Sequence, residues 1–229
     1  MPRSLEQLAA ALPKRRLTRG ASVPVSGICY DSRRVVPGDL FVCVRGLRYD
    51  GHDFAGEAAS KGAVAIVAER ELPDVALPQV IVPESRLALA LLAAAFYDYP
   101  SSRLRLIGVT GTNGKTTTTH LIKAILEAAG WKTGLLGTIH NMIGDQELAA
   151  TMTTPESADL LMMLDRMVNA GVRAAVMEVS SHALALQRTA GCEFDGAVLT
   201  NVTQDHLDFH PTFADYLEAK TRLFRELGD

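Results

Sequence analysis

The sequence predicts an α/β protein made of two units, each built on a sheet of parallel strands. Short runs of apolar and β-branched residues alternate with amphipathic stretches of helical period along the chain, which is typical of parallel strands connected by helices. A glycine- and threonine-rich loop joins one such strand to the helix that follows it. The 229 residues, of which 48% are apolar, are enough for two domains of ordinary size.

The first unit is expected to span residues 1–101. Ser4-Leu-Glu-Gln7 has the form of a capping box, and apolar residues follow it at helical spacing until Pro13. Pro37-Gly38 marks a turn between two short strands, and Ser85 is the expected cap of the last helix. The expected strands of this unit are residues 27–30, 39–44, 63–67 and 79–82, and its further helices are 53–61 and 85–97.

The second unit is expected to span residues 102–229, because Tyr99-Pro-Ser-Ser102 has the composition of a linker. An apolar strand leads through the glycine-rich loop into a helix, which is the start of a parallel sheet. Thr154 and Pro155 predict the cap and the first position of a later helix. The expected strands are residues 104–109, 133–139, 173–179 and 196–200, and the expected helices are 115–129, 155–170 and 213–227.

The second unit has only these four expected strands and ends inside or directly after a helix. Two interpretations are open: a small complete sheet domain, or the N-terminal part of a longer protein. We favour the longer protein. Missing strands would leave an exposed sheet edge, which can support self-association.

Composition and charge exclude several classes of protein. The 23 Lys+Arg and 26 Asp+Glu give a net charge of −3, so no basic field is present to bind nucleic acid. Cys29, Cys43 and Cys192 form no C-x-x-C pair, which fits a reducing compartment. No apolar run approaches the roughly 20 residues of a membrane span, and the first residues lack a signal-peptide core. We therefore expect a soluble, cytoplasmic protein without nucleic-acid or membrane partners.

The loop Val109-Thr-Gly-Thr-Asn-Gly-Lys-Thr-Thr117 is a candidate phosphate site. Its backbone N–H groups, at the N-terminus of a helix, could surround phosphate oxygens. Lys115 would neutralise the β- and γ-phosphates, and Thr116 would offer its hydroxyl to Mg²⁺. The chain departs from the strict G-x-x-x-x-G-K-[ST] pattern, because its first glycine position is taken by Val109. An ordinary strand-to-helix turn is the alternative.

Polar side chains also follow two other expected strands. Glu178 ends an apolar strand, where a buried carboxylate needs a cation such as nucleotide-bound Mg²⁺, although it could instead point to solvent. Residues 201–210 contain two Asp, two His and one Asn, which indicates a metal or phosphate site, with a solvated loop as the alternative. Zinc is the weaker metal because no H-E-x-x-H is present. By composition alone, Lys220 is a surface lysine on an amphipathic helix.

These motifs resemble those of the Mur ligases of bacterial cell-wall synthesis, and the resemblance covers the whole chain. Within that family, the chain is most similar to the branch that adds the third peptide residue to UDP-N-acetylmuramoyl-L-alanyl-D-glutamate. The motifs that carry the resemblance are Asp31-Ser-Arg33, Pro37-Gly-Asp-Leu-Phe41, Asp50-Gly-His-Asp53, Gly111-Thr-Asn-Gly-Lys-Thr-Thr117, Thr153-Thr-Pro155, Met177-Glu-Val-Ser-Ser-His182 and Asp205-His-Leu-Asp208.

The resemblance implies an ATP-dependent amide ligase of peptidoglycan precursor synthesis. The γ-phosphoryl group would pass to the D-glutamate carboxylate, and the amine of a diamino acid, meso-diaminopimelate or L-lysine, would then displace inorganic phosphate. The implied partners are UDP-N-acetylmuramoyl-dipeptide, ATP and the diamino acid, bound by a monomer. Since the family's C-terminal domain is not recognisable here, these residues alone are expected to lack turnover.

The resemblance also implies roles for individual residues. Lys115 and Lys220 would be catalytic, and Lys220 would carry a carbamate as N6-carboxylysine. Mg²⁺ would be held by Thr116, Glu178, His206 and the modified Lys220. ATP would be bound by Gly111, Thr112, Asn113, Gly114, Lys115, Thr116 and Thr117. The UDP-sugar dipeptide would contact Tyr30, Ser32, Leu47, Arg48, Tyr49, Thr153, Thr154, Ser180 and Arg188.

One departure and two alternative functions belong beside this resemblance. Leu186 stands where some family members have a glutamine, so the adjacent Gln187 receives no role. The sister ligase that adds D-Ala-D-Ala shares the domain plan, but the Thr-Asn-Gly-Lys and Met-Glu-Val-Ser-Ser-His runs argue against it. A nucleotide- or UDP-sugar-binding module without catalysis is the second alternative.

Overall fold

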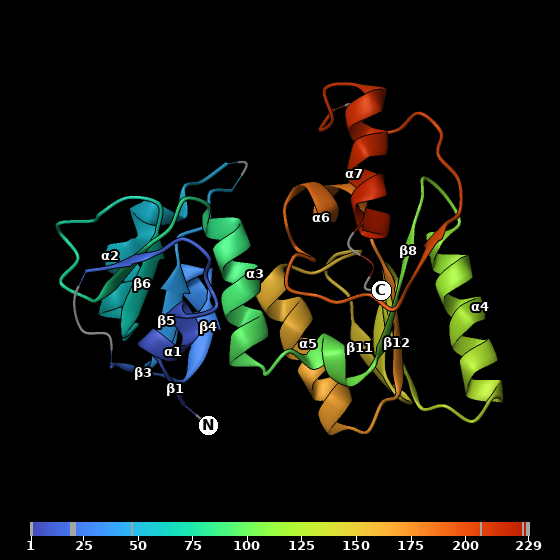
Figure 1. The fold of residues 1–229 in the computed structure, drawn as a ribbon, viewed down its shortest axis with the longest axis horizontal. Coiled ribbons are helices and arrows are strands. Elements are labelled where there is room, and N and C mark those ends of the chain that lie inside the picture. Colours follow the sequence, from blue (N-terminus) through green and yellow to red (C-terminus); the bar gives the residue numbers. More distant parts are fainter. Residues whose placement is uncertain (1, 19–21, 47, 207, 226, 228–229) are drawn as a thin grey trace. The chain divides into compact units, whose positions relative to one another are not determined.

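The computed structural model describes residues 2–18, 22–46, 48–206, 208–225 and 227, and it divides into two compact units (Figure 1). The units are Met1–Asp98 and Tyr99–Asp229. Each contains a sheet with parallel strands and helices against it, so the predicted α/β fold class is confirmed. The short helix η3 (Pro100–Arg103), in the expected linker, contacts α5 and β8 of the second unit.

The first unit is built on a five-stranded sheet with the order β2-β7-β6-β5-β4. Strands β4 to β7 are parallel, and β2 joins one edge antiparallel. A separate two-stranded sheet pairs β1 with β3. The elements are β1 (Arg3–Ser4), α1 (Leu5–Ala9), β2 (Arg16–Leu17), β3 (Pro24–Val25), β4 (Gly27–Cys29), η1 (Ser32–Arg34), β5 (Asp39–Val42), η2 (Gly51–Phe54), α2 (Ala55–Ser60), β6 (Ala65–Ala68), β7 (Gln79–Ile81) and α3 (Ser85–Phe96).

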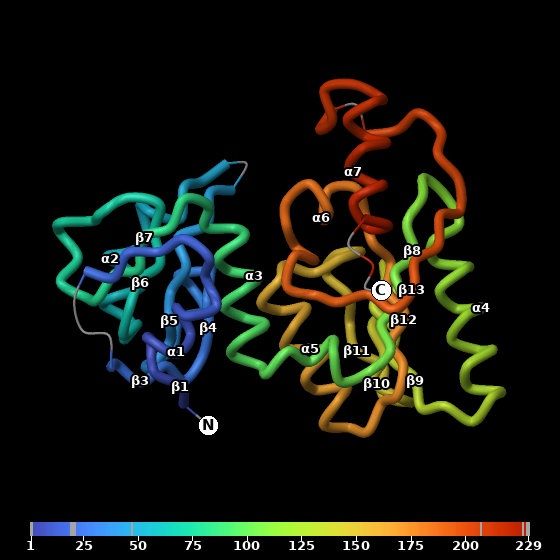
Figure 2. The backbone as a smooth tube through the Cα atoms, viewed as in Figure 1, coloured from blue at the N-terminus to red at the C-terminus, as the bar shows by residue number. Residues whose placement is uncertain are grey.

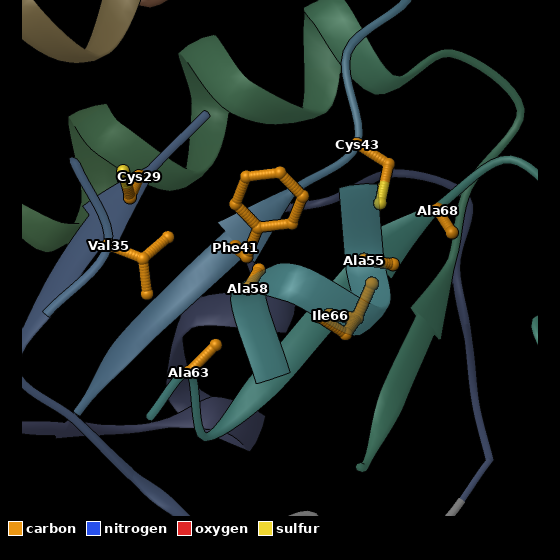
Figure 3. Packing of buried hydrophobic residues seen from close by; sticks show 9 residues of the cluster. All are labelled: Cys29, Val35, Phe41, Cys43, Ala55, Ala58, Ala63, Ile66 and Ala68. Carbon is orange, nitrogen blue, oxygen red and sulfur yellow. The ribbon is translucent and has the colours of Figure 1, made fainter. Parts of the chain in front are cut away.

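One core cluster of this unit lies between the sheet and helix α2 (Figure 3). The small side chains of Ala55 and Ala58 let α2 approach the buried strands β5 and β6 closely, and Phe41 and Ile66 fill the space between them. Cys29, Cys43 and Cys192 are buried and form no disulfide, and burial raises the pKa of the Cys43 thiol to about 12. These cysteines therefore serve as small apolar residues.

Two of the predicted helix caps in the first unit had different outcomes. The capping box of Ser4 and Gln7 is present in α1, so that prediction is confirmed. Ser85 is not a cap: α3 begins at Ser85 after the N-cap Glu84, and the Ser85 amide and hydroxyl both donate to Oε1 of Glu69, at 3.0 and 2.9 Å. The Ser85 hydroxyl, which the local pattern predicted to cap the helix, is instead bonded to a residue distant in sequence.

The second unit contains a six-stranded sheet with the order β11-β10-β9-β12-β8-β13. Strands β9, β12, β8 and β13 are parallel, and the hairpin of β10 and β11 extends the sheet antiparallel. The elements are β8 (Arg105–Thr110), α4 (Lys115–Ala128), β9 (Thr133–Leu136), β10 (His140–Ile143), β11 (Gln146–Ala149), α5 (Ser157–Asn169), β12 (Ala174–Glu178), α6 (Ser181–Ala185), β13 (Gly196–Leu199) and α7 (Phe213–Arg225).

Helices cover both faces of this sheet, as Figure 2 shows for α4 on one side and α5 on the other. Val109 and Leu135 point to the α4 face, where Ile122 and Leu126 pack on them. Since side chains alternate along a strand, the neighbouring glycines point to the other face. There, a Cβ on Gly134 would lie 2.5 Å from Met167 of α5, so the helix packs directly on the strand backbone.

Two expectations for the second unit were wrong, and one helix was missed. About four strands were expected, but the hairpin around Gly144-Asp145 adds two. The helix expected from Pro155 begins at Ser157, after the N-cap Glu156, because Thr154 donates its hydroxyl to the backbone of Glu178 instead of capping. The short helix α6 was not predicted. None of the helices among the described residues has both the length and the apolar composition of a membrane span.

Candidate active site

The glycine-rich loop connects β8 to α4 at the carboxyl end of the parallel sheet, where open α/β sheets bind ligands. Gly111 has φ +146° and Gly114 has φ +83°, conformations that favour glycine. Gly114 is the N-cap of α4, no side chain caps this end, and the first turn carries no acidic residue. The N–H groups of that turn are therefore available to an anion.

Two lysines converge on the carbonyl oxygen of Gly111. Nζ of Lys115 lies 2.8 Å from it and 2.9 Å from the carbonyl of Thr112, while Nζ of Lys220 lies 2.9 Å from Gly111 O. Burial lowers the pKa of both lysines, and the neighbouring ammonium of Lys115 lowers that of Lys220 further, to about 8. A polyanion at the loop would relieve this concentration of positive charge.

The residues after β13 hold the loop from its other side. The Thr200 hydroxyl donates to the carbonyl of Asn113 at 2.6 Å, and the Asn201 amide donates to the same oxygen at 3.1 Å. Asn201 also accepts the N–H groups of Thr112 and Asn113, through its backbone and side-chain oxygens. Sequence reasoning gave Thr200 no role, although its place at the end of the strand beside β8 was a usable signal.

Glu178 is 1% exposed, so the interpretation of a solvated carboxylate is wrong. Its Oε1 accepts the Thr116 hydroxyl at 2.9 Å and the Thr138 amide at 3.0 Å, and its Oε2 accepts the Thr138 hydroxyl at 3.0 Å. A Cβ on Gly137 would lie 2.6 Å from Oε1, so only glycine leaves room for this carboxylate. The adjacent hydroxyl and carboxylate oxygens are the hard ligands that Mg²⁺ prefers, and this pair fits that ion.

Lys220 is 2% exposed, which contradicts its assignment as a surface lysine by composition. It lies on α7, and its ammonium is 4.4 Å from the ring centroid of Tyr216, one turn earlier. The Tyr216 side chain is fully buried, and its hydroxyl lies 2.9 Å from Oγ1 of Thr112 in the loop. Tyr216 therefore connects α7 to the phosphate loop, a role that sequence reasoning missed.

His206 lies in the segment between β13 and α7, with its side chain 43% exposed and Nε2 3.6 Å from an Asp205 oxygen. Its ring contacts those of His182, at 4.8 Å between centroids, and Tyr216, at 6.2 Å. Burial lowers the pKa of His182 and His210, and Nε2 of the buried His210 has no hydrogen-bond partner among the described residues. Within the described ranges, no three His, Cys, Asp or Glu side chains form a metal-binding group.

The residues assigned to the peptide end of the substrate lie together beside Glu178. The Thr154 hydroxyl donates to the Glu178 carbonyl at 2.9 Å and accepts the Ser180 amide at 3.1 Å. Nε of Arg188 donates to Glu156 at 2.8 Å, and its Nη1 donates to the Thr154 carbonyl at 3.1 Å. The Thr153 hydroxyl, 3.0 Å from that of Thr138, adds a donor at the same edge.

The candidate UDP residues lie in the first unit, in separate contacts. The Ser32 hydroxyl donates to Glu57 at 2.9 Å, and the Ser32 carbonyl accepts from Lys61 at 3.0 Å. Tyr49 is 72% exposed and its ring meets that of Phe54 edge-on. Arg48 is exposed, Tyr30 is half-buried, and Leu47 lies outside the described residues.

A hollow of about 880 Å³ lies at the opposite, amino end of the second sheet. Three of its charged side chains have partners: Arg105 is ion-paired with Asp195, and the Arg173 guanidinium lies 4.3 Å from the centroid of the Trp131 ring. We place the active site at the carboxyl end, because the glycine-rich loop, Glu178 and Lys220 meet there.

Comparison with known families agrees with this geometry. The family description "Mur ligase middle domain" matches residues 109–229, and "Mur ligase family, catalytic domain" matches residues 24–97. The first match alone covers more than half of the chain. The chain belongs to the Mur ligase family.

Curated Mur ligases share about half of the residues in this chain. A UDP-N-acetylmuramoyl-L-alanyl-D-glutamate–2,6-diaminopimelate ligase from Geobacillus thermodenitrificans is 53% identical over 98% of the chain and 46% of its own length. An enzyme of the same name from Listeria monocytogenes is 47% identical over the same shares. The chain thus spans about half the length of the curated relatives it matches.

Solved Mur ligases share the fold. One UDP-N-acetylmuramoyl-L-alanyl-D-glutamate–2,6-diaminopimelate ligase superposes with a TM-score of 0.83 at 30% identity, over 99% of this chain and 45% of that one. A UDP-N-acetylmuramoylalanyl-D-glutamyl-2,6-diaminopimelate–D-alanyl-D-alanyl ligase from Acinetobacter baumannii gives a TM-score of 0.68 at 22% identity, over 100% of this chain and 47% of that one. The second likeness shows the fold alone.

Proposed function

We propose that this chain supplies the UDP-sugar-binding and ATP-binding units of an ATP-dependent amide ligase, in a cytoplasmic step of peptidoglycan precursor synthesis. The reaction joins a diamino acid to the D-glutamate of UDP-N-acetylmuramoyl-L-alanyl-D-glutamate. The γ-phosphoryl group moves to the glutamate carboxylate, the amine attacks the resulting acyl phosphate, and inorganic phosphate leaves. The proposed units are residues 1–101 and 102–229, working as a monomer.

The observation that carries the proposal is the contact between Thr116 and the buried Glu178 beside the phosphate loop. An ordinary strand-to-helix turn that binds no ligand does not require a buried carboxylate at the end of the neighbouring strand. With Lys115 on the loop, the same edge offers groups of both signs to a nucleotide and its cation. The membership of the Mur ligase family agrees with this interpretation.

ATP, which donates the phosphoryl group, and the D-glutamate carboxylate, which accepts it, are both anionic. The site must therefore screen the charge of one from the other. Thr116 and Glu178 would hold one Mg²⁺, which when bound neutralises charge on the phosphates. We propose that His206 and carbamylated Lys220 serve a second ion. The ammonium of Lys220 would repel a cation, whereas its lowered pKa, about 8, leaves a larger neutral fraction to react with carbon dioxide and present oxygen ligands.

The incoming amino acid is proposed from the relatives. Proteins named for 2,6-diaminopimelate are 47% and 53% identical to this chain, which favours meso-diaminopimelate over L-lysine. The sister ligase that adds D-Ala-D-Ala is the competing assignment. It would bind UDP-N-acetylmuramoyl-tripeptide more tightly than the dipeptide, and a direct comparison of the two ligands by calorimetry decides between them.

Nucleotide binding is the first test of the proposal. We expect Lys115→Met to weaken Mg²⁺–ATP binding at least tenfold, because the variant loses the ammonium at the loop. Lys132→Met is the matched control, since it removes the same charge from an exposed lysine after α4. Equal affinities of the two variants, both folded by circular dichroism, would refute the assignment of the loop.

UDP-sugar binding by a Ser32 variant tests the assignment of the first unit. Ser32→Ala should weaken binding of the UDP-muramoyl dipeptide, whereas Ser60→Ala, an exposed serine on the neighbouring helix, should not. Because the chain spans about half the length of its relatives, we expect it to bind both ligands without forming product. Release of phosphate and product from ATP, dipeptide and diaminopimelate would contradict that expectation.

A further inference from the structure

Two histidines that the ligase assignment does not use face each other in the second unit. His120 lies on α4 and His140 is the first residue of β10. Their Nε2 atoms are 3.4 Å apart, and their rings meet at 72° with centroids 5.4 Å apart. His140 shares a strand face with Met142, which packs with α4 on the core, so the backbone brings this side chain to the helix.

The group beside Nδ1 of each ring favours one position for the proton of that ring. Nδ1 of His120 is 2.8 Å from the carbonyl oxygen of Thr116, which can only accept, so this nitrogen carries the hydrogen. Nδ1 of His140 lies 3.4 Å from a carboxylate oxygen of Glu147, an acceptor that favours the hydrogen on this nitrogen. When both neutral rings carry their hydrogen on Nδ1, both Nε2 atoms present lone pairs, and these two atoms are 3.4 Å apart.

We propose that His120 and His140 bind one divalent transition-metal ion of the Zn²⁺, Co²⁺ or Ni²⁺ class through their Nε2 atoms. Two nitrogens at about 2.0–2.1 Å from a tetrahedral Zn²⁺ lie about 3.3–3.4 Å apart, which matches the separation of 3.4 Å. Imidazole suits these ions, whereas Mg²⁺ prefers oxygen ligands. The pair is thus selective against the ion proposed for the nucleotide.

The surroundings of the pair have the features that accompany metal-binding histidines. Such histidines commonly donate their other nitrogen to a carbonyl or carboxylate, which orients the ring and raises its basicity, and Thr116 and Glu147 occupy these places. The His140 side chain is 21% exposed, so water can complete the coordination. A bound ion would tie α4 to the edge hairpin. This inference does not depend on the proposed function.

Metal binding to the chelator-stripped chain tests the proposal. We expect one Co²⁺ or Zn²⁺ per chain, visible absorption of tetrahedral Co²⁺, and no displacement by a tenfold excess of Mg²⁺. His120→Gln and His140→Gln should each weaken Zn²⁺ binding at least tenfold, and the double variant should bind at least as weakly as either single variant. Glu147→Gln should keep the stoichiometry and lose a smaller factor, since it contacts the ligand and not the ion.

The control is His182→Gln, which disrupts the separate histidine cluster beside α7. Loss of the ion in this variant together with its retention in His120→Gln would overturn the proposal. Absence of Zn²⁺ binding by the folded parent chain would also overturn it, and would mean that one histidine shares a proton with the other. Thermal melts in the presence of chelator show whether each variant folds. The Co²⁺ spectrum is recorded on the parent chain, so it tests the proposal even if a variant fails to fold.

Discussion

Replacing Gly111 by alanine should destabilise the second unit more than replacing a glycine whose added Cβ would meet no other atom. At φ +146°, Gly111 lies far from the left-handed well near +57° that other residues can enter. The added Cβ would lie 1.9 Å from Oγ1 of Thr200 and 3.0 Å from the backbone oxygen of Asn201. Thr200 can rotate, but only by giving up its 2.6 Å bond to the Asn113 carbonyl, and the Asn201 backbone cannot rotate away.

The expected loss in the free energy of unfolding is the sum of the backbone strain and the broken hydrogen bond. Backbone strain of this kind costs about 1–3 kcal/mol, and the broken hydrogen bond about 1 kcal/mol more, which gives about 2–4 kcal/mol in the free energy of unfolding. Gly130→Ala is the matched control, because Gly130 has φ +78° and no atom within 4 Å of its added Cβ. It should lose only the left-handed penalty of about 1 kcal/mol.

Urea unfolding followed by tryptophan fluorescence measures both variants. Trp131 is the single tryptophan of the sequence and lies in the second unit, so its signal reports on that unit. Adding Thr200→Ala to Gly111→Ala removes the clashing oxygen and should restore part of the loss. Equal losses in Gly111→Ala and Gly130→Ala, or no rescue by the second substitution, would refute this reasoning.

Three further predictions concern charge and hydrogen bonding. Lys220→Met should raise the free energy of unfolding at pH 7 by up to about 2 kcal/mol, because a pKa near 8 disfavours the buried ammonium. Between pH 8 and about 10.4 the unfolded state binds more protons than the folded state, so the parent gains stability and the difference between parent and variant should shrink. A constant difference in urea melts at pH 7 and pH 10 would contradict this. Between pH 7 and pH 5, His210→Phe should lose less stability than the parent. The pKa of His210 is lowered in the folded state, so protonation of this side chain below pH 6.5 favours unfolding. Identical losses in the two proteins would show that His210 does not cause the loss. Arg188→Lys should lower stability by about 1–2 kcal/mol, since a lysine cannot bond Glu156 and the Thr154 carbonyl in the same geometry, and an unchanged urea midpoint would show those bonds to be neutral.

The sequence predicted the parallel framework because its signals are local. Apolar runs bounded by turn residues located β8, β12 and β13 within one or two residues, and the glycine loop predicted the start of α4 at Lys115. The strands β1, β2 and β3 have two residues each, which is too short for any period to be visible. The hairpin of β10 and β11 was missed because its strands mix polar and apolar residues, although Gly144-Asp145 between them was a turn signal.

The groups around the phosphate loop were harder to predict because distant parts of the chain supply them. Lys220 reaches Gly111 from more than a hundred residues away, and its burial follows from where α7 packs. Thr154 and Ser85 each looked like a helix cap, but a tertiary partner took the hydroxyl in both cases. Tertiary contacts of this kind override local capping preferences, and only the fold shows which partner is within reach.

The phosphate loop has one property that sets how it would receive a ligand. The carbonyl groups of its residues 111, 112 and 113 all point to donors: Lys115 and Lys220 at the first, Lys115 at the second, and Thr200 with Asn201 at the third. The negative ends of these dipoles are thereby turned away from an approaching anion, before any anion is bound. Such a preorganised field needs little reorientation on binding, so association should be fast and sensitive to salt rather than limited by loop rearrangement.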